Sequence, residues 1–109
     1  MYVPEQGDII QIDFDPSAGK EVIKRRPAYV LSRLPFNDQT EFAIVAPITS
    51  TVRGISLEVV LAEATKTHGS ILVHQMHSLD FKARSAVFVE KCPSEIREKV
   101  MQIAKLLVS

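Results

Sequence analysis

Residues 24–32 read KRRPAYVLS, three consecutive cations followed at once by a proline and a run of strand-forming residues. Pro27 has a fixed φ and disfavours a helical conformation for the residue before it, so Arg26 is expected to be extended. The stretch therefore predicts a core β-strand over 27–33 whose entrance carries fixed positive charge. On composition alone, the more ordinary interpretation is a solvated basic turn that precedes a core strand.

The length and composition indicate one globular domain, residues 1–109, with enough apolar side chains for a single core. The 109 residues are 46% hydrophobic, and 13 Lys plus Arg balance 13 Asp plus Glu. The charges are unevenly distributed, because residues 1–15 hold four acidic and no basic side chains. Residues 20–33 hold five basic and one acidic side chain, a local charge of +4 that suits an anionic ligand.

A single cysteine, Cys92, cannot form an intrachain disulfide, which makes the reducing cytoplasm the expected compartment. No basic start followed by an apolar stretch resembles a signal peptide, and no apolar run has the length of a membrane span. His74 and His77 lack a third ligand nearby and are expected to be surface or structural residues. We therefore expect a soluble, unprocessed protein without a metal site, a cofactor or a membrane partner.

Apolar patterning and turn residues predict short strands at 9–14, 27–33, 42–48, 55–62, 71–73 and 86–89. A polar loop of about ten residues follows the first strand, and loops of that length in compact domains are often functional. Residues 35–39 are expected to form a turn. Residues 75–84 are expected to hold a single helical turn or a loop.

The final segment, from Pro93 to about residue 108, changes to a helical period. Its apolar residues form one stripe, consisting of Ile96, Val100, Ile103, Ala104 and Leu107. Glu95 in the first turn and Lys105 near the end match the helix dipole. The predicted fold is mainly β, a small, strongly bent antiparallel sheet or barrel closed by a C-terminal helix.

Two candidate functional groups lie where core strands meet polar loops. Arg26 begins one strand, and Thr49 and Ser50 follow the end of the next. If these strands pair antiparallel, the start of one meets the end of the other, and Arg26 and Thr49 share one rim of the sheet. A guanidinium beside hydroxyl donors would stabilise a phosphate whose charge rises in a transition state. Taken singly, both hydroxyl residues are ordinary turn residues.

Glu21 is the carboxylate nearest in sequence to Arg26 within the predicted loop. It is a candidate proton acceptor for chemistry at the rim. The alternative is a simple ion pair with Lys24 or Arg25.

Four motifs resemble the MazF/PemK toxins in order and spacing. They are residues 2–10 (YVPEQGDII), 13–16 (DFDP), 26–32 (RPAYVLS) and 47–50 (PITS). The resemblance continues through 57–61, 69–73, 75–78 and the final helix, and so covers almost the whole chain. It implies an SH3-like barrel, a homodimer and a ribosome-independent endoribonuclease that cleaves single-stranded RNA at short sequences. It also implies a cognate antitoxin whose disordered tail occupies the RNA groove.

The resemblance assigns roles to individual residues. Arg26 matches the family's catalytic Arg, Thr49 its catalytic Thr, and Glu21 a position where some members have a proposed catalytic Glu. Gln75 and Ser78 match positions near the base-recognition groove. Further residues expected to contact RNA are Lys20, Lys24, Arg25, Ser50, Arg53 and Arg84.

The sequence also departs from the family pattern at three positions. Gln11 and Phe81 stand where some relatives have Trp, and Arg25 stands where a His precedes the catalytic Arg in others. These changes leave the expected chemistry intact and bear on which RNA sequence is recognised.

The implied mechanism needs no metal ion, because RNA carries its own nucleophile in the 2′-OH beside each scissile phosphate. Arg26 would stabilise the developing charge, and the products would be a 2′,3′-cyclic phosphate and a 5′-OH. Two alternatives remain: a noncatalytic toxin of the CcdB type, which poisons DNA gyrase through its C-terminal helix, and an SH3-like module that binds without chemistry. The first would not need an Arg and a Thr on one rim.

Overall fold

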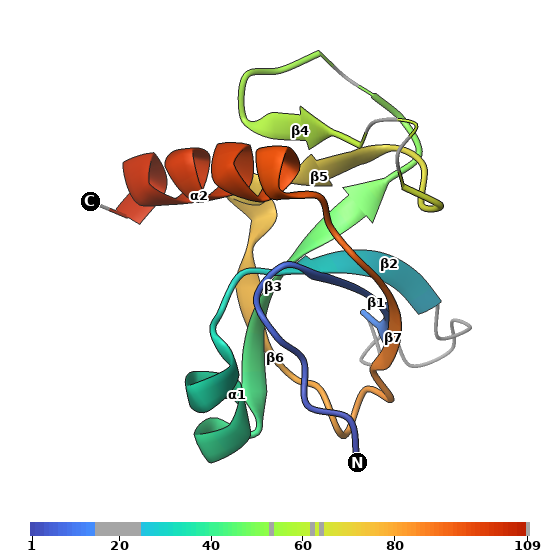
Figure 1. Ribbon diagram of the computed structural model, residues 1–109, viewed down its shortest axis with the longest axis vertical. Coiled ribbons are helices and arrows are strands. Elements are labelled where there is room, and N and C mark those ends of the chain that lie inside the picture. Colours follow the sequence, from blue (N-terminus) through green and yellow to red (C-terminus); the bar gives the residue numbers. More distant parts are fainter. Residues whose placement is uncertain (15–24, 53, 62, 64, 109) are drawn as a thin grey trace, which may run out of the picture.

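The computed structural model describes residues 1–14, 25–52, 54–61, 63 and 65–108, which form a bent antiparallel sheet with two helices (Figure 1). The elements in chain order are β1 (Asp8–Asp13), β2 (Arg25–Val30), α1 (Leu34–Thr40), β3 (Phe42–Thr49), β4 (Glu58–Val60), β5 (Ser70–Leu72), the 3₁₀ turn η1 (Val73–Gln75), β6 (His77–Asp80), β7 (Val87–Lys91) and α2 (Ser94–Val108). The strand order is β4-β5-β3-β2-β1-β7, and β6 pairs with the first half of β3. The predicted fold class, mainly β with a C-terminal helix, is confirmed.

The central strands bury residues on both faces of the sheet, as the unbroken apolar run at 42–48 predicts. Tyr29 and Ala46 belong to one core cluster, which also includes residues of α2. Val30 and Val45 belong to a second cluster, which also includes residues of β1. Because β2 and β3 contribute to both clusters, their mutual register is held by packing from two sides.

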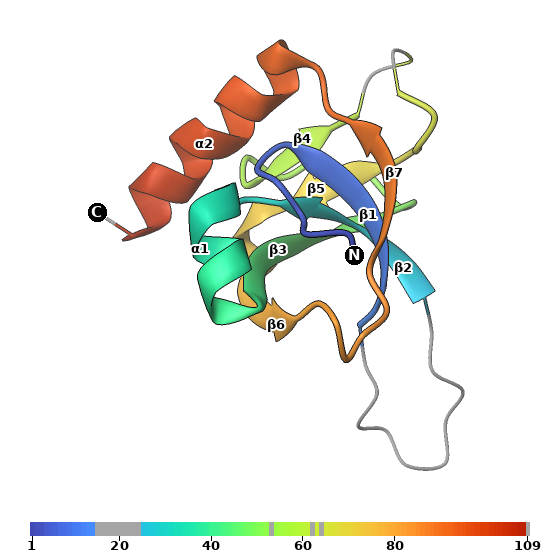
Figure 2. The same ribbon diagram turned by 60° about the horizontal axis from the view of Figure 1, so that its bottom comes forward.

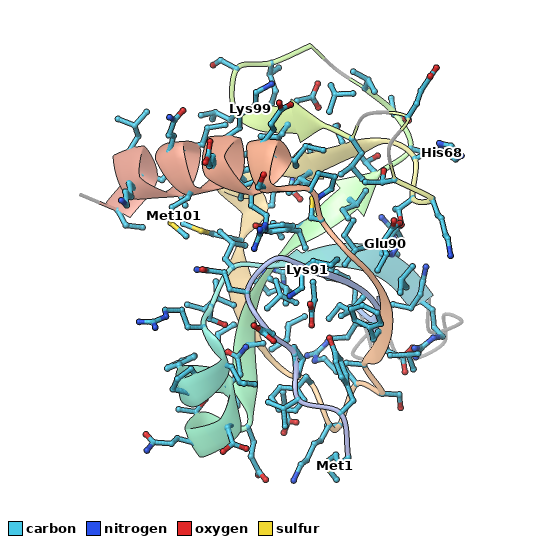
Figure 3. The ribbon with its side chains drawn as sticks, viewed as in Figure 1. Met1, His68, Glu90, Lys91, Lys99 and Met101 are labelled. Atoms are coloured by element: carbon cyan, nitrogen blue, oxygen red, sulfur yellow. The ribbon has the colours of Figure 1, made fainter. Side chains whose placement is uncertain are left out.

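Helix α2 follows the predicted stripe: Ile96, Val100 and Ala104 are buried, and the helix packs against η1 and β4. Lys99 and Met101 lie on opposite sides of it (Figure 3). Cys92, just before the helix, is buried, and this burial raises the pKa of its thiol to about 11. The thiol is therefore neutral near pH 7 and unsuited to nucleophilic chemistry.

The prediction of a turn at 35–39 was wrong, because this segment is part of helix α1. The helix is anchored by a polar residue and not by an apolar stripe. Asn37 is fully buried and donates hydrogen bonds from its side-chain nitrogen to the carbonyl oxygens of Pro4 (2.7 Å) and Ser32 (3.1 Å). A segment whose buried residue is an asparagine has no hydrophobic period from which a helix can be read.

The prediction of a lone helical turn or loop over 75–84 was also wrong in part. The helical turn η1 precedes most of it, and β6 then pairs with β3, with Ile44 opposite Ser78 and Val45 opposite His77. Leu79 is the one buried residue of β6, too little for an alternating pattern to be recognised. The strand expected at 55–62 is shorter than predicted, since regular pairing covers Glu58–Val60.

No helix of the described part of the chain is both long and apolar enough to span a membrane.

Candidate active site

The β2–β3 pairing places the two candidate strand ends at the same rim. The strands are antiparallel, with Ala28 opposite Pro47 and Val30 opposite Val45, and β2 lies between β1 and β3 (Figure 2). Extending this register by two residues puts Arg26 opposite Thr49. The other edge of β2 pairs Arg26 with Ile12 of β1.

The Arg26 side chain is exposed, and it makes no hydrogen bond or ion pair within the described residues. Its backbone is fixed by the ladder while its guanidinium reaches solvent. A planar fork with five N–H donors in such a position suits two oxygens of one phosphate.

Thr49 is half-buried and more tightly held than Arg26. Its Oγ1 accepts a hydrogen bond from the Thr51 amide at 3.2 Å, and its backbone pairs with Ser70 of β5. Since the hydroxyl oxygen accepts from the loop that follows, its own hydrogen can be donated to a ligand. Ser50, the next residue, is exposed.

The carbonyl oxygen of Thr49 lies against Gly69, which leaves no room for a side chain there. A Cβ added to Gly69 would come within 1.9 Å of that oxygen, and the residue has a φ of +118°. Only glycine combines this backbone conformation with so close an approach. The backbone of Thr49 is therefore held closely against the start of β5.

Arg25 and Arg84, two predicted RNA contacts, are engaged within the protein. Arg25 Nη1 pairs with Asp13 Oδ1 at 2.9 Å, and its Nη2 donates to the carbonyl oxygens of Gln11 (3.2 Å) and Ser85 (2.7 Å). Arg84 Nη1 donates to the carbonyl oxygens of Asp13 (3.2 Å) and Phe14 (2.8 Å). Both arginines hold the end of β1, and only part of each guanidinium remains accessible to a ligand.

The bend of the sheet brings the end of β1 to β6. The Phe14 and His77 rings are 5.4 Å apart and inclined at 60°. His77 Nδ1 is 2.9 Å from the Gln75 carbonyl oxygen, and Gln75, His77 and Ser78 are all exposed. The predicted base-recognition residues thus reach the neighbourhood of the β1–β2 ladder through a contact that the sequence analysis did not anticipate.

The loop that contains Lys66 and Thr67, just before β5, is fixed by Glu90 of β7 (Figure 3). Its carboxylate accepts hydrogen bonds from the Lys66 amide (3.0 Å) and from the amide and hydroxyl of Thr67 (both 2.9 Å). Burial alone would raise the pKa of Glu90, but these hydrogen bonds outweigh it and lower the pKa. The loop depends on this carboxylate being ionised.

Four predicted site residues, Lys20, Glu21, Lys24 and Arg53, lie outside the described residues. Within the described ranges, no three His, Cys, Asp or Glu side chains gather as metal ligands would.

A family profile described as "PemK-like, MazF-like toxin of type II toxin-antitoxin system" matches residues 5–108. The chain belongs to this family. It is 40% identical over 85 residues to the endoribonuclease toxin MazF of Escherichia coli K12, covering 78% of this chain and 76% of that one. It is 37% identical over 102 residues to the endoribonuclease toxin ChpB of the same strain, covering 89% and 87%.

The fold agrees with this membership in the PemK/MazF family. A chain in the crystal structure of MazE-MazF (Form-II) from Deinococcus radiodurans superposes with a TM-score of 0.90 and 33% sequence identity, covering all of both chains.

The contact between Gly69 and Thr49 leads to a stability prediction for this PemK/MazF-family chain. Gly69→Ala is expected to destabilise the fold by more than about 2 kcal/mol, because overpacking adds to an unfavourable φ. Gly54→Ala is the matched control: Gly54 also has a positive φ (+74°), but nothing lies within 4 Å of an added Cβ. It should cost about 1 kcal/mol. Urea unfolding of both variants compares them, and equal losses would contradict the proposed close contact.

Proposed function

We propose that this chain is an endoribonuclease toxin that cleaves single-stranded RNA through attack of the 2′-OH on the adjacent phosphate. The observation that carries the proposal is the antiparallel β2–β3 pairing, whose register, continued by two residues beyond its last pair, would bring Arg26 and Thr49 to one rim. Membership of a family with endoribonuclease relatives at 40% identity supports the same activity.

Arg26 and Thr49 act on the phosphate from two neighbouring strands. Arg26 stabilises the charge that develops on the nonbridging oxygens, and Thr49 donates its hydroxyl hydrogen to the same group. Because the guanidinium stays protonated at any ordinary pH, Arg26 is not the initial proton acceptor. Glu21 is the candidate for that role, and the leaving 5′ oxygen takes up a proton as the 2′,3′-cyclic phosphate forms.

RNA bound at this rim runs past several further side chains. Ser50, Arg25 and Arg84 are expected to contact the RNA, as are the cations Lys20, Lys24 and Arg53, which lie outside the described residues. Gln75 and Ser78 read bases, because the Phe14–His77 contact joins their segment to the end of β1. Exposed amide and hydroxyl groups suit the hydrogen-bonding edges of unstacked bases.

The protein acts in the cytoplasm as a homodimer, and a cognate antitoxin inhibits it by covering the RNA groove. Support for the antitoxin comes from the family description and from the similarity to a MazE-MazF structure. A gyrase-poisoning toxin of the CcdB type or a passive binding module would gain nothing from an arginine and a threonine on one rim. Incubating the pure protein with a defined single-stranded RNA and mapping the cut ends separates these functions.

Arg26→Ala and Thr49→Ala are each expected to slow cleavage about 100-fold or more, since each removes a donor to developing charge. Arg26→Lys should restore little, because a point charge cannot replace a planar fork on two phosphate oxygens. Single-turnover cleavage of a labelled RNA measures the effect. Arg33→Ala is the matched control, because this exposed arginine lies beyond the opposite end of β2 and should keep the wild-type rate.

Replacing the 2′-OH at the scissile position by hydrogen tests the nucleophile independently. Binding should persist and cleavage should stop. Normal cleavage of this substrate, or of wild-type RNA by the Arg26→Ala protein, would overturn the proposed site.

Cleavage is expected to be independent of divalent metal ions, because the substrate supplies the nucleophile and cationic and hydroxyl donors stabilise the charge. The rate should be unchanged after dialysis against EDTA. Activity that disappears in EDTA and returns with magnesium would contradict the mechanism.

The active species is expected to be a homodimer, because a domain of this size leaves large apolar side chains exposed. They include Leu106 and Val108 of α2. Sedimentation at micromolar concentration should give twice the monomer mass. A monomer with full ribonuclease activity would rule the dimer out.

A further inference from the structure

Glu58 is a buried carboxylate at the start of β4 and only 9% exposed. A carboxylate in such a place is costly unless hydrogen bonds satisfy it. Its Oε1 accepts a hydrogen bond from the Gly54 amide, and its Oε2 accepts one from Ser70 Oγ at 2.8 Å. The side chain therefore joins the segment before β4 to strand β5.

The two partners of Glu58 belong to segments that adjoin Thr49 in the chain or in the sheet. Gly54 lies five residues after Thr49, in the connection that leaves β3. Ser70 is the residue opposite Thr49 in the β3–β5 ladder, and Gly69 beside it lies against the Thr49 carbonyl oxygen. One carboxylate thus fixes the connection that follows Thr49 and the strand that pairs with it.

We infer that Glu58 is a positioning residue for the proposed reaction, which holds Gly54 and Ser70 so that the Thr49 hydroxyl faces the phosphate beside Arg26. The inference rests on the proposed function. Glu58 does not touch the RNA, because its side chain is buried and both oxygens already accept hydrogen bonds within the protein. Its effect on cleavage passes through the Thr51 amide, which orients Thr49 Oγ1 from within the same connection.

Glu58→Leu removes both hydrogen bonds while keeping a side chain of similar volume. Single-turnover cleavage is expected to fall by about 10- to 100-fold, because a displacement on the order of 1 Å misaligns a catalytic donor. The Kd for the RNA with a 2′-deoxy scissile nucleotide should stay within about threefold, since the lost interaction acts in the transition state. Exchange of the Gly54 amide with deuterium should become faster.

Glu58→Gln should restore cleavage to within about threefold of wild type, because its carbonyl oxygen can accept from Gly54 and its NH₂ can donate to Ser70 Oγ. If Glu58 only filled space, Glu58→Gln would not cleave faster than Glu58→Leu. If Glu58→Leu fails to fold, Ser70→Ala provides the test. It removes one of the two hydrogen bonds and is expected to slow cleavage by about three- to tenfold with RNA affinity unchanged.

Asp8→Leu is the matched control. Asp8 is 3% exposed and, like Glu58, accepts hydrogen bonds from a backbone amide, that of Glu5 at 3.0 Å, and from a hydroxyl, that of Tyr2. Its other oxygen, Oδ1, also pairs with Lys91 at 2.6 Å. It lies at the opposite end of β1 from Ile12, the partner of Arg26. Asp8→Leu should lower the melting temperature and leave the cleavage rate of the folded protein unchanged.

Equal slowing by Asp8→Leu and Glu58→Leu would show a general effect of losing a buried carboxylate and would overturn the inference. So would wild-type cleavage by Glu58→Leu, or by Ser70→Ala where Glu58→Leu does not fold. Arg26→Ala and Thr49→Ala in the same assay keep the two proposals apart. If both cleave normally, the proposed function is wrong; if both are slow and the Glu58 variant is not, only the positioning role is wrong.

Discussion

The register between β2 and β3 is the constraint on which the rest of the structure depends. A slip of one residue would exchange the two faces of β2 and move Tyr29 and Val30 each into the wrong core cluster. Because both faces of the sheet are packed, a shifted register would lose the buried contacts of the native one and gain no others in their place. Continued by two residues, the same register would put Arg26 opposite Thr49, so the proposed geometry of the candidate site follows from core packing.

The two sides of that rim differ in rigidity, in a way that suits their proposed roles. Thr49 is fixed by a neighbouring amide, a paired strand and a glycine contact, and so it can direct one hydroxyl. Arg26 is fixed only in its backbone, which leaves the guanidinium able to follow a phosphate as its geometry changes. The guanidinium of the adjacent Arg25, by contrast, is held by Asp13 and by carbonyl oxygens.

The sequence reveals those parts of the fold that are built from apolar repetition. The stripe of α2 and the runs of β1 to β3 were predicted because apolar side chains recur there with the period of the element. Helix α1 and strand β6 were missed because they are anchored by Asn37 and Leu79 alone. Glu58 lies in the segment 55–62 that was predicted as a strand, and its burial and its hydrogen bonds to Gly54 and Ser70 are specified by no local pattern.

An overall charge of zero is compatible with binding a polyanion, because several carboxylates are already paired or hydrogen-bonded within the protein. Asp8 and Asp13 pair with cations, while Glu58 and Glu90 accept hydrogen bonds from loop amides. The two ion pairs are nearly neutral beyond a few ångströms, and salt screens what remains of the other charges. An exposed arginine without an internal partner then sets the local field. At the rim that residue is Arg26, whose exposed guanidinium makes no hydrogen bond or ion pair within the described part of the chain and so is available to a phosphate.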